Sequence, residues 1–194
     1  MKKSVYIWII IAAVLVLGYF MFKGKYNTMV AKDESVQTAW SQVENQYQRR
    51  VDLVPNLVST VKGSASHERE TLQSVTEART KATQTSVNVH DAEQMAQFQE
   101  VQSQLGSALS RLLVVVESYP DLKASQNFVS LQTQLEGTEN RIATERMRYN
   151  ESVRDYNIYL RQFPNNLFAG MFGFEKAALF EMDEGAGEVP DVQF

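Results

Sequence analysis

The sequence predicts an all-α protein in which an N-terminal transmembrane helix leads into an elongated antiparallel bundle of three long helices. Two patterns predict this fold: an apolar run opens the chain, and beyond it large apolar side chains recur at steps of three, four or seven residues, which is one face of a helix. A third observation argues against a sheet. With four prolines and nine glycines in 194 residues, the chain has little room for the turns of an all-β fold.

The apolar run extends from Val5 to Phe22 and holds 18 uncharged residues with lysines on both sides. At about 1.5 Å per residue it reaches roughly 27 Å, close to the hydrocarbon thickness of a bilayer. Trp8 and Tyr19 lie near its ends, where membrane interfaces favour aromatic rings. A cleaved signal peptide would end in small residues, whereas this run ends in GYFMFKGK. We therefore expect an uncleaved, single-pass anchor in the cell (inner) membrane. Lysines on both sides leave its orientation open.

The first helix of the bundle is expected over residues 27–84, and it would be about 85 Å long if unbroken. Such a length indicates a coiled-coil-like rod or a long bundle. Pro55 lies inside this helix, where it removes one backbone donor and crowds the carbonyl of Val51. Because the apolar stripe resumes in phase at Leu57, we expect a kink and not a break. The stripe consists of Val36, Trp40, Val43, Tyr47, Val54, Leu57, Val61, Leu72 and Val75.

Two further helices are expected over 91–118 and 125–162, each ending near a proline. Asp91 is the expected N-cap of the earlier one. In the later helix every seventh residue is apolar or aromatic, and the paired positions are half polar, which favours packing within a bundle over a strict two-stranded coiled coil. The repeat consists of Phe128, Leu135, Ile142, Tyr149, Tyr156 and Phe163. The loops between helices are short, so neighbouring helices should be antiparallel.

The C-terminal tail, residues 165–194, is first apolar and then acidic. Its apolar part, Leu167 to Phe180, can pack back on the bundle, bind another subunit or lie on the bilayer surface. We favour packing within the assembly. From Met182 the tail is acidic, with glycine and proline, a composition typical of segments without regular structure.

Arg50 stands where the stripe of the first helix would place an apolar residue, between Tyr47 and Val54. A buried arginine is costly unless it is paired. Either its stem lies on the apolar surface and its head reaches water, or it pairs with an acid of the last helix. A buried pair would cost stability but could fix the register of long helices. The candidate acids are Glu136, Glu139 and Glu145, beside a glycine that allows close helix approach.

Several long segments resemble the LemA family of bacterial membrane proteins. They are the apolar N-terminus, AWSQVENQYQRRVDLVPNLVSTVKGSASHE (39–68), EAR (77–79), YPDLKASQNFVSLQTQLEGTENRIA (119–143), RYNESVRDYN (148–157) and FPNNLFAGMFGF (163–174). The resemblance implies an N-terminally anchored, all-helical protein with no assigned catalytic residue. It also marks a middle motif, which consists of Arg49, Arg50, Asp52, Pro55 and Asn56, and a later motif, which consists of Glu139, Asn140 and Arg141. With Glu136, Phe163 and Pro164 added, the candidate structural or interaction residues are Arg49, Arg50, Asp52, Pro55, Asn56, Glu136, Glu139, Asn140, Arg141, Phe163 and Pro164.

Catalytic and ligand chemistry finds little support in the sequence. His67 and Glu68 lack the second histidine of a zincin motif, because Thr71 stands in its place. There is no glycine-rich phosphate loop, no G-x-S-x-G and no cysteine. Nucleic acid is not an expected partner either, since the net charge is −4 and the basic residues are not clustered. We expect no metal, no cofactor and no small-molecule substrate.

The sequence therefore favours a non-enzymatic, membrane-anchored helical scaffold that self-associates or docks partner membrane proteins. An overlong first helix would leave an apolar stripe uncovered, and sister chains in a homo-oligomer would cover it. The alternative is an adaptor or sensor subunit that binds a membrane protease or a signalling protein.

Overall fold

The computed structural model describes residues 2–65 and 67–181. These residues form six helices and, within those two ranges, no strand, so the predicted all-α class is confirmed. The acidic end of the tail, from Met182, lies outside the described residues. The helices are α1 (Lys2–Ser64), α2 (Arg69–Gln84), α3 (Ala92–Val116), α4 (Pro120–Lys123), α5 (Gln126–Arg161) and α6 (Asn165–Phe172).

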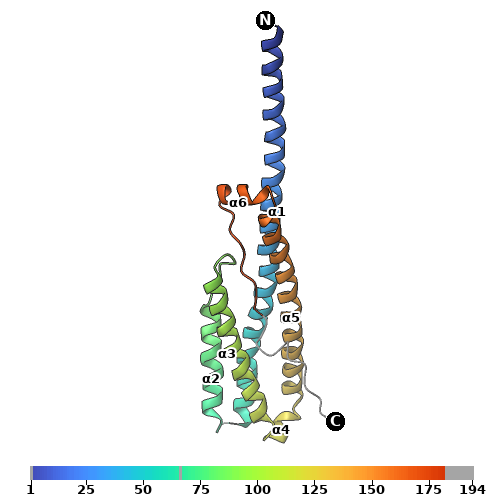
Figure 1. Ribbon diagram of the computed structural model, residues 1–194. Coiled ribbons are helices and arrows are strands. Elements are labelled where there is room, and N and C mark those ends of the chain that lie inside the picture. Colours follow the sequence, from blue (N-terminus) through green and yellow to red (C-terminus); the bar gives the residue numbers. More distant parts are fainter. Residues whose placement is uncertain (1, 66, 182–194) are drawn as a thin grey trace, which may run out of the picture.

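α1, α2, α3 and α5 form the bundle, and each runs antiparallel to the long helix before it (Figure 1). α1 descends from the N-terminus, α2 returns beside it, α3 descends again and α5 runs back up along α1, while the short α4 lies at the lower turn. The closest helix pairs are α1 with α5, α2 with α3, and α1 with α2. The N-terminal part of α1 projects beyond all the others.

The helix expected over 27–84 is two helices, and this expectation was wrong. α1 ends at Ser64 and α2 begins at Arg69. Between Val61 and Leu72 the sequence has no large apolar residue, so nothing in this stretch would bury a continuing helix. The chain instead turns at Ala65, which is fully buried, and Tyr119 donates a hydrogen bond to Glu68 at 3.0 Å. The turn brings Leu72 and Val75 against the same core as Val61.

The apolar stripe of α1 is buried within the chain itself. Its lower half belongs to a core with α2, α3, α4 and the start of α5, and its upper half to a second core rich in aromatic rings. Met29, Val36, Val43 and Val61 are each 0% exposed. The apolar stripe of α1, which was expected to need sister chains to cover it, is thus covered by other helices of the same chain.

The heptad repeat of α5 is buried from Phe128 to Tyr156, but its last member is not. Phe163 is 81% exposed, because α5 ends at Arg161 and the seam shifts to Val153 and Leu160. The predicted N-cap is confirmed: Asp91 accepts hydrogen bonds from the backbone N–H groups of Glu93 and Gln94.

Beyond α6, residues 173–181 form an extended strap that runs back over the bundle (Figure 1). Phe180 at its end is buried among the rings of Trp40, Tyr47, Phe98 and Tyr149. Packing of the tail on the bundle is therefore confirmed for the strap.

Candidate functional site

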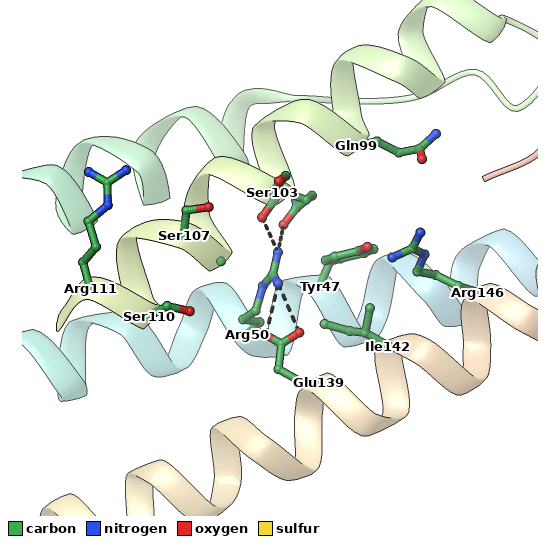
Figure 2. A pocket seen from close by; sticks show the side chains of 12 residues that line it. Tyr47, Arg50, Gln99, Ser103, Ser107, Ser110, Arg111, Glu139, Ile142 and Arg146 are labelled. Atoms are coloured by element: carbon green, nitrogen blue, oxygen red, sulfur yellow. Dashed lines mark hydrogen bonds and ion pairs between the residues drawn. The ribbon is translucent and has the colours of Figure 1, made fainter. Parts of the chain in front are cut away.

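An open, polar groove of about 580 Å³ lies between α3 and α5, with α1 as its floor (Figure 2). Small residues of α3 form one wall, and three arginines from three different helices reach it. The lining residues are Tyr47, Arg50, Gln99, Gln102, Ser103, Gly106, Ser107, Ser110, Arg111, Glu139, Ile142 and Arg146.

Arg50 lies at the centre of the floor and is 4% exposed. Its Nη1 donates to Glu139 of α5 at 3.0 and 3.3 Å, as Figure 2 shows. Its Nη2 donates to the backbone oxygen of Gln102 on α3 at 3.0 Å and to the Gln102 side chain at 2.6 Å. The guanidinium also lies 5.0 Å from the centre of the Tyr47 ring. One side chain thus joins α1, α3 and α5.

This geometry decides between the two interpretations of Arg50. Its head does not reach water but pairs with an acid of α5, and that acid is Glu139. The other two candidates bind elsewhere: Glu136 accepts from Gln132 at 3.0 Å, and Glu145 accepts from Arg148 at 2.8 Å. The order of helices could not select among the three, because the register of α1 against α5 was not known.

Gln102 was not among the residues predicted from the sequence. It is 4% exposed and accepts both hydrogen bonds that Nη2 of Arg50 donates. A signal was present: Gln102 lies between Phe98 and Leu105 on the apolar face of α3, just as Arg50 interrupts the face of α1. Two polar interruptions on helices that pack in one bundle are typical of a buried polar contact.

The backbone hydrogen bond that Pro55 removes is replaced by a side chain that was not predicted from the sequence. α1 continues through it, so the expected absence of a break is confirmed. Proline cannot donate to the carbonyl of Val51, one turn earlier, and Nε of Arg79 on α2 donates to that oxygen at 3.2 Å instead. A side chain of the neighbouring helix replaces the lost backbone hydrogen bond.

The remaining predicted residues do not gather in the groove. Arg49, Asp52, Asn56, Asn140 and Arg141 are exposed on α1 and α5, and Asp52 accepts from Gln48 at 2.8 Å. Phe163 and Pro164 lie at the opposite end of α5, before α6. Of the predicted set, only Arg50 and Glu139 line the groove.

Two asparagines of α5 hold the strap above the groove. Asn157 donates to the oxygen of Ala177 at 2.9 Å and accepts from its N–H at 3.0 Å. Asn150 makes the same pair of hydrogen bonds with Phe180, at 3.1 and 2.9 Å. Both were missed, although the Tyr-Asn pair repeats seven residues apart, which is two turns on one helix face.

The strap ends at the mouth of the groove. The N–H of Glu181 donates to Gln99 at 3.1 Å, and Arg146 donates to the Glu181 oxygen at 3.0 Å. Gln99 and Arg146 both line the groove. The walls of α3 and α5 thus already hold one extended chain through hydrogen bonds to its backbone.

Two tyrosines of the upper core have raised pKa values. Burial raises the pKa of Tyr149, whose hydroxyl donates to the oxygen of Ala178 at 2.7 Å. Burial also raises the pKa of Tyr156, and the nearby Asp33 carboxylate adds to the effect. Asp33 lies 3.1 Å from Nε2 of His90.

The side chains that line the groove are suited to binding a ligand and not to catalysing a reaction. It contains serines and arginines but no histidine among its lining residues, and the described part of the chain holds no group of three or more His, Cys, Asp or Glu side chains placed for a metal. Arginines and hydroxyls bind carboxylates, and a wall of small residues allows a backbone to approach closely.

The candidate membrane span is the exposed part of α1. Within the described residues, one helix is long and apolar enough to cross a bilayer; its most apolar 18-residue window lies near the N-terminus, has a mean hydropathy of 2.1 and is 0% buried. The predicted anchor, Val5 to Phe22, belongs to this helix.

The chain is similar to known proteins over most of its length. The pattern that describes the LemA family matches residues 39–194. "Magnetosome protein MamQ 2" of Paramagnetospirillum magneticum is 29% identical over 185 residues, which cover 86% of this chain and 68% of that protein. "Protein LemA" of Metamycoplasma hominis is 26% identical over 173 residues, which cover 88% of this chain and 76% of that protein.

Proposed function

The chain belongs to the LemA family, and we propose that it works as a non-enzymatic helical scaffold fixed to the cell membrane by its N-terminal helix. LemA is not known as an enzyme family, and the relatives above are named for the family or for the magnetosome, not for a reaction. The apolar N-terminal helix and these relatives support membrane association.

One observation carries the proposal: α1 is a single helix that contains the candidate span, continues through the bundle and forms the floor of the groove. Arg50 follows Phe22 by 28 positions, which places it about 40 Å along the helix from the end of the span. Because a continuous helix is rigid, the groove would be held at a fixed height above the bilayer. This is the geometry of a presenting scaffold.

Self-association is part of this proposal, but its physical basis differs from the one expected. The stripe of the bundle is covered within the chain, so sister chains would meet through the span, whose most apolar 18-residue window is 0% buried. Light scattering on detergent-solubilised protein after size exclusion measures the stoichiometry directly. A monomer at every concentration would overturn self-association and leave the anchor in place.

The groove favours a second candidate function, an adaptor that binds a partner membrane protein. We commit to one occupant, an extended acidic segment of that partner. The strap shows that these walls hold an extended chain, because Gln99 and Arg146 of the walls bind the backbone of Glu181 at its end. Arg111 lines the groove as well, and it is exposed. Arginine forks recognise carboxylates through paired hydrogen bonds.

A photo-crosslinking amino acid at Ser107, inside the groove, separates the two candidates in living cells. Val129 is the control position, because it is exposed on α5 and is not among the groove-lining residues. The adaptor predicts a crosslink to a different membrane protein from Ser107 only, and its loss in Arg111→Glu. A crosslink to residues 182–194 of this chain, to a sister copy or to nothing contradicts the adaptor.

A further inference from the structure

An uncharged apolar segment lies at the junction between the bundle and the candidate span. Residues 163–174, FPNNLFAGMFGF, carry no charge. They include α6, which begins after Pro164 and ends at Gly173, where a φ of +75° closes the helix with a left-handed residue.

Ring contacts fix α6 to the exit of the span. Phe168 packs on Phe22, the last residue of the apolar run, with ring centres 4.4 Å apart. Phe172 packs edge-on against Tyr26 at 5.1 Å. α6 therefore meets α1 within about one turn of the point where the apolar run gives way to lysines. Figure 1 shows α6 lying across the axis of α1 at the upper end of the bundle.

Only one side of α6 is used by the bundle. Asn165 and Ala169 are buried, and Asn165 donates to the backbone oxygen of Tyr159 at 2.9 Å. In contrast, Phe163, Leu167 and Met171 are 81%, 57% and 74% exposed. These large apolar side chains recur every fourth residue at the end of the bundle nearest the span.

Basic residues lie at the same level. Lys23 and Lys25 directly follow the span, and the ammonium groups of Lys25 and Lys32 lie 5.7 and 5.8 Å from the centre of the Tyr159 ring. Lysines at the membrane boundary reach phosphate headgroups, whereas apolar side chains of an in-plane helix enter the boundary of the acyl chains.

We propose that α6 is an interfacial helix that lies in the plane of the bilayer surface where α1 emerges, with Phe163, Leu167 and Met171 immersed among the lipids. The inference rests on the proposed membrane anchor and adds a second contact to it. Because α6 crosses α1, this contact would resist tilting of the bundle, which a single helical anchor does not.

The experiment uses the absence of cysteine from the chain. Single variants Met171→Cys, Leu167→Cys, Met147→Cys and Leu15→Cys carry an environment-sensitive fluorophore in proteoliposomes of phosphatidylcholine and phosphatidylglycerol. Met147 is the matched control, because it is 57% exposed on α5, about 20 Å from the end of that helix. Quenching is measured with nitroxide lipids labelled near the headgroup or deep in the acyl chain.

The inference expects labels at positions 171 and 167 to lose most of their fluorescence to the shallow quencher, the label at 147 to keep it, and the label at 15 to respond to the deep quencher. Quenching at 15 with none at 171 and 167 overturns the interfacial helix and leaves the anchor standing. No quenching at 15 overturns the anchor, and the interfacial helix with it.

Discussion

Arg50 and Glu139 form an ion pair with a 3.0 Å separation in which the arginine side chain is 5% exposed and the carboxylate 45%. The cost of desolvation therefore falls mainly on the arginine, while the acid keeps part of its hydration. Gln102 carries no charge, but it accepts the hydrogen bonds that Nη2 of the guanidinium donates. The pair fixes the register of α1 against α5 at one position of two long helices.

Removal of this pair should destabilise the bundle. For Arg50→Ala we expect a loss of roughly 2–4 kcal/mol, because packing disappears and Gln102 loses its buried partner. For Glu139→Ala we expect roughly 1–3 kcal/mol, since a buried guanidinium loses its acid. Urea unfolding of the solubilised chain, followed by circular dichroism, measures both. Arg49→Ala is the matched control, exposed and next in sequence, and should change stability by less than about 0.5 kcal/mol. Equal effects at Arg49 and Arg50 would refute a buried pair.

The hydrogen bond from Arg79 to the oxygen of Val51 makes a second prediction. Arg79→Met should cost about 1–2 kcal/mol, because it leaves a partly buried carbonyl without a donor. Pro55→Ala restores the backbone donor, so in that background the same change should cost markedly less. A double-mutant cycle on unfolding free energies measures the coupling. Lys81→Met, at an exposed position of the same helix, is the control. Additive effects of Pro55→Ala and Arg79→Met would show that the arginine does not replace the missing bond.

The elements that follow from the sequence are those set by local patterns. The apolar N-terminal helix, the cap at Asp91 and the heptad of α5 depend on neighbouring residues, and all three occur in the structure, the heptad as far as Tyr156. The turn at Ala65 has no proline and no aspartate or asparagine, and it is stabilised by a long-range hydrogen bond from Tyr119 to Glu68. An apolar periodicity that resumes at Leu72, after ten residues without a large apolar side chain, predicts either one long helix or two packed ones.

The site was predictable only where a residue broke a pattern. Arg50 interrupts an apolar stripe, so its burial and pairing could be proposed. The partner could not be chosen, because Glu136, Glu139 and Glu145 differ only by register. Arg79 and the two asparagines lie on faces that look solvated, and their roles come from a carbonyl and a strap distant in sequence.

Asn150 and Asn157 should control release of the strap. Replacing either by alanine removes two hydrogen bonds to strap backbone, which we expect to cost about 1–3 kcal/mol of local stability. Lys176 lies within the strap and is a cleavage site for trypsin, so the variants should be cut there faster than the parent chain. Asn140→Ala, exposed on the same helix, should leave the cleavage rate unchanged. If Asn150→Ala, Asn157→Ala and Asn140→Ala are all cut at the parent rate, the two strap-binding asparagines do not hold the strap.

Tyr149 should make the bundle sensitive to alkali. Burial raises its pKa, so above the usual tyrosine value near 10 the unfolded chain loses a proton that the folded chain keeps. The folded state then binds more protons than the unfolded state, and stability is full below about pH 10 and falls as pH rises from there toward the raised pKa. The slope for one such tyrosine is at most about 1.4 kcal/mol per pH unit.

Tyr149→Phe separates this titration from packing. At neutral pH the variant should be less stable by about 1 kcal/mol, because the hydrogen bond to the oxygen of Ala178 is lost. Above pH 10 its stability should fall less steeply than that of the parent, so that the two curves converge. Unfolding free energies from urea titrations between pH 7 and about pH 11.5 measure the difference. Asn150→Ala removes strap contacts but no tyrosine, so its curve should run parallel to the parent curve. If the curves of Tyr149→Phe and the parent also stay parallel, the buried phenol does not cause the alkaline loss of stability.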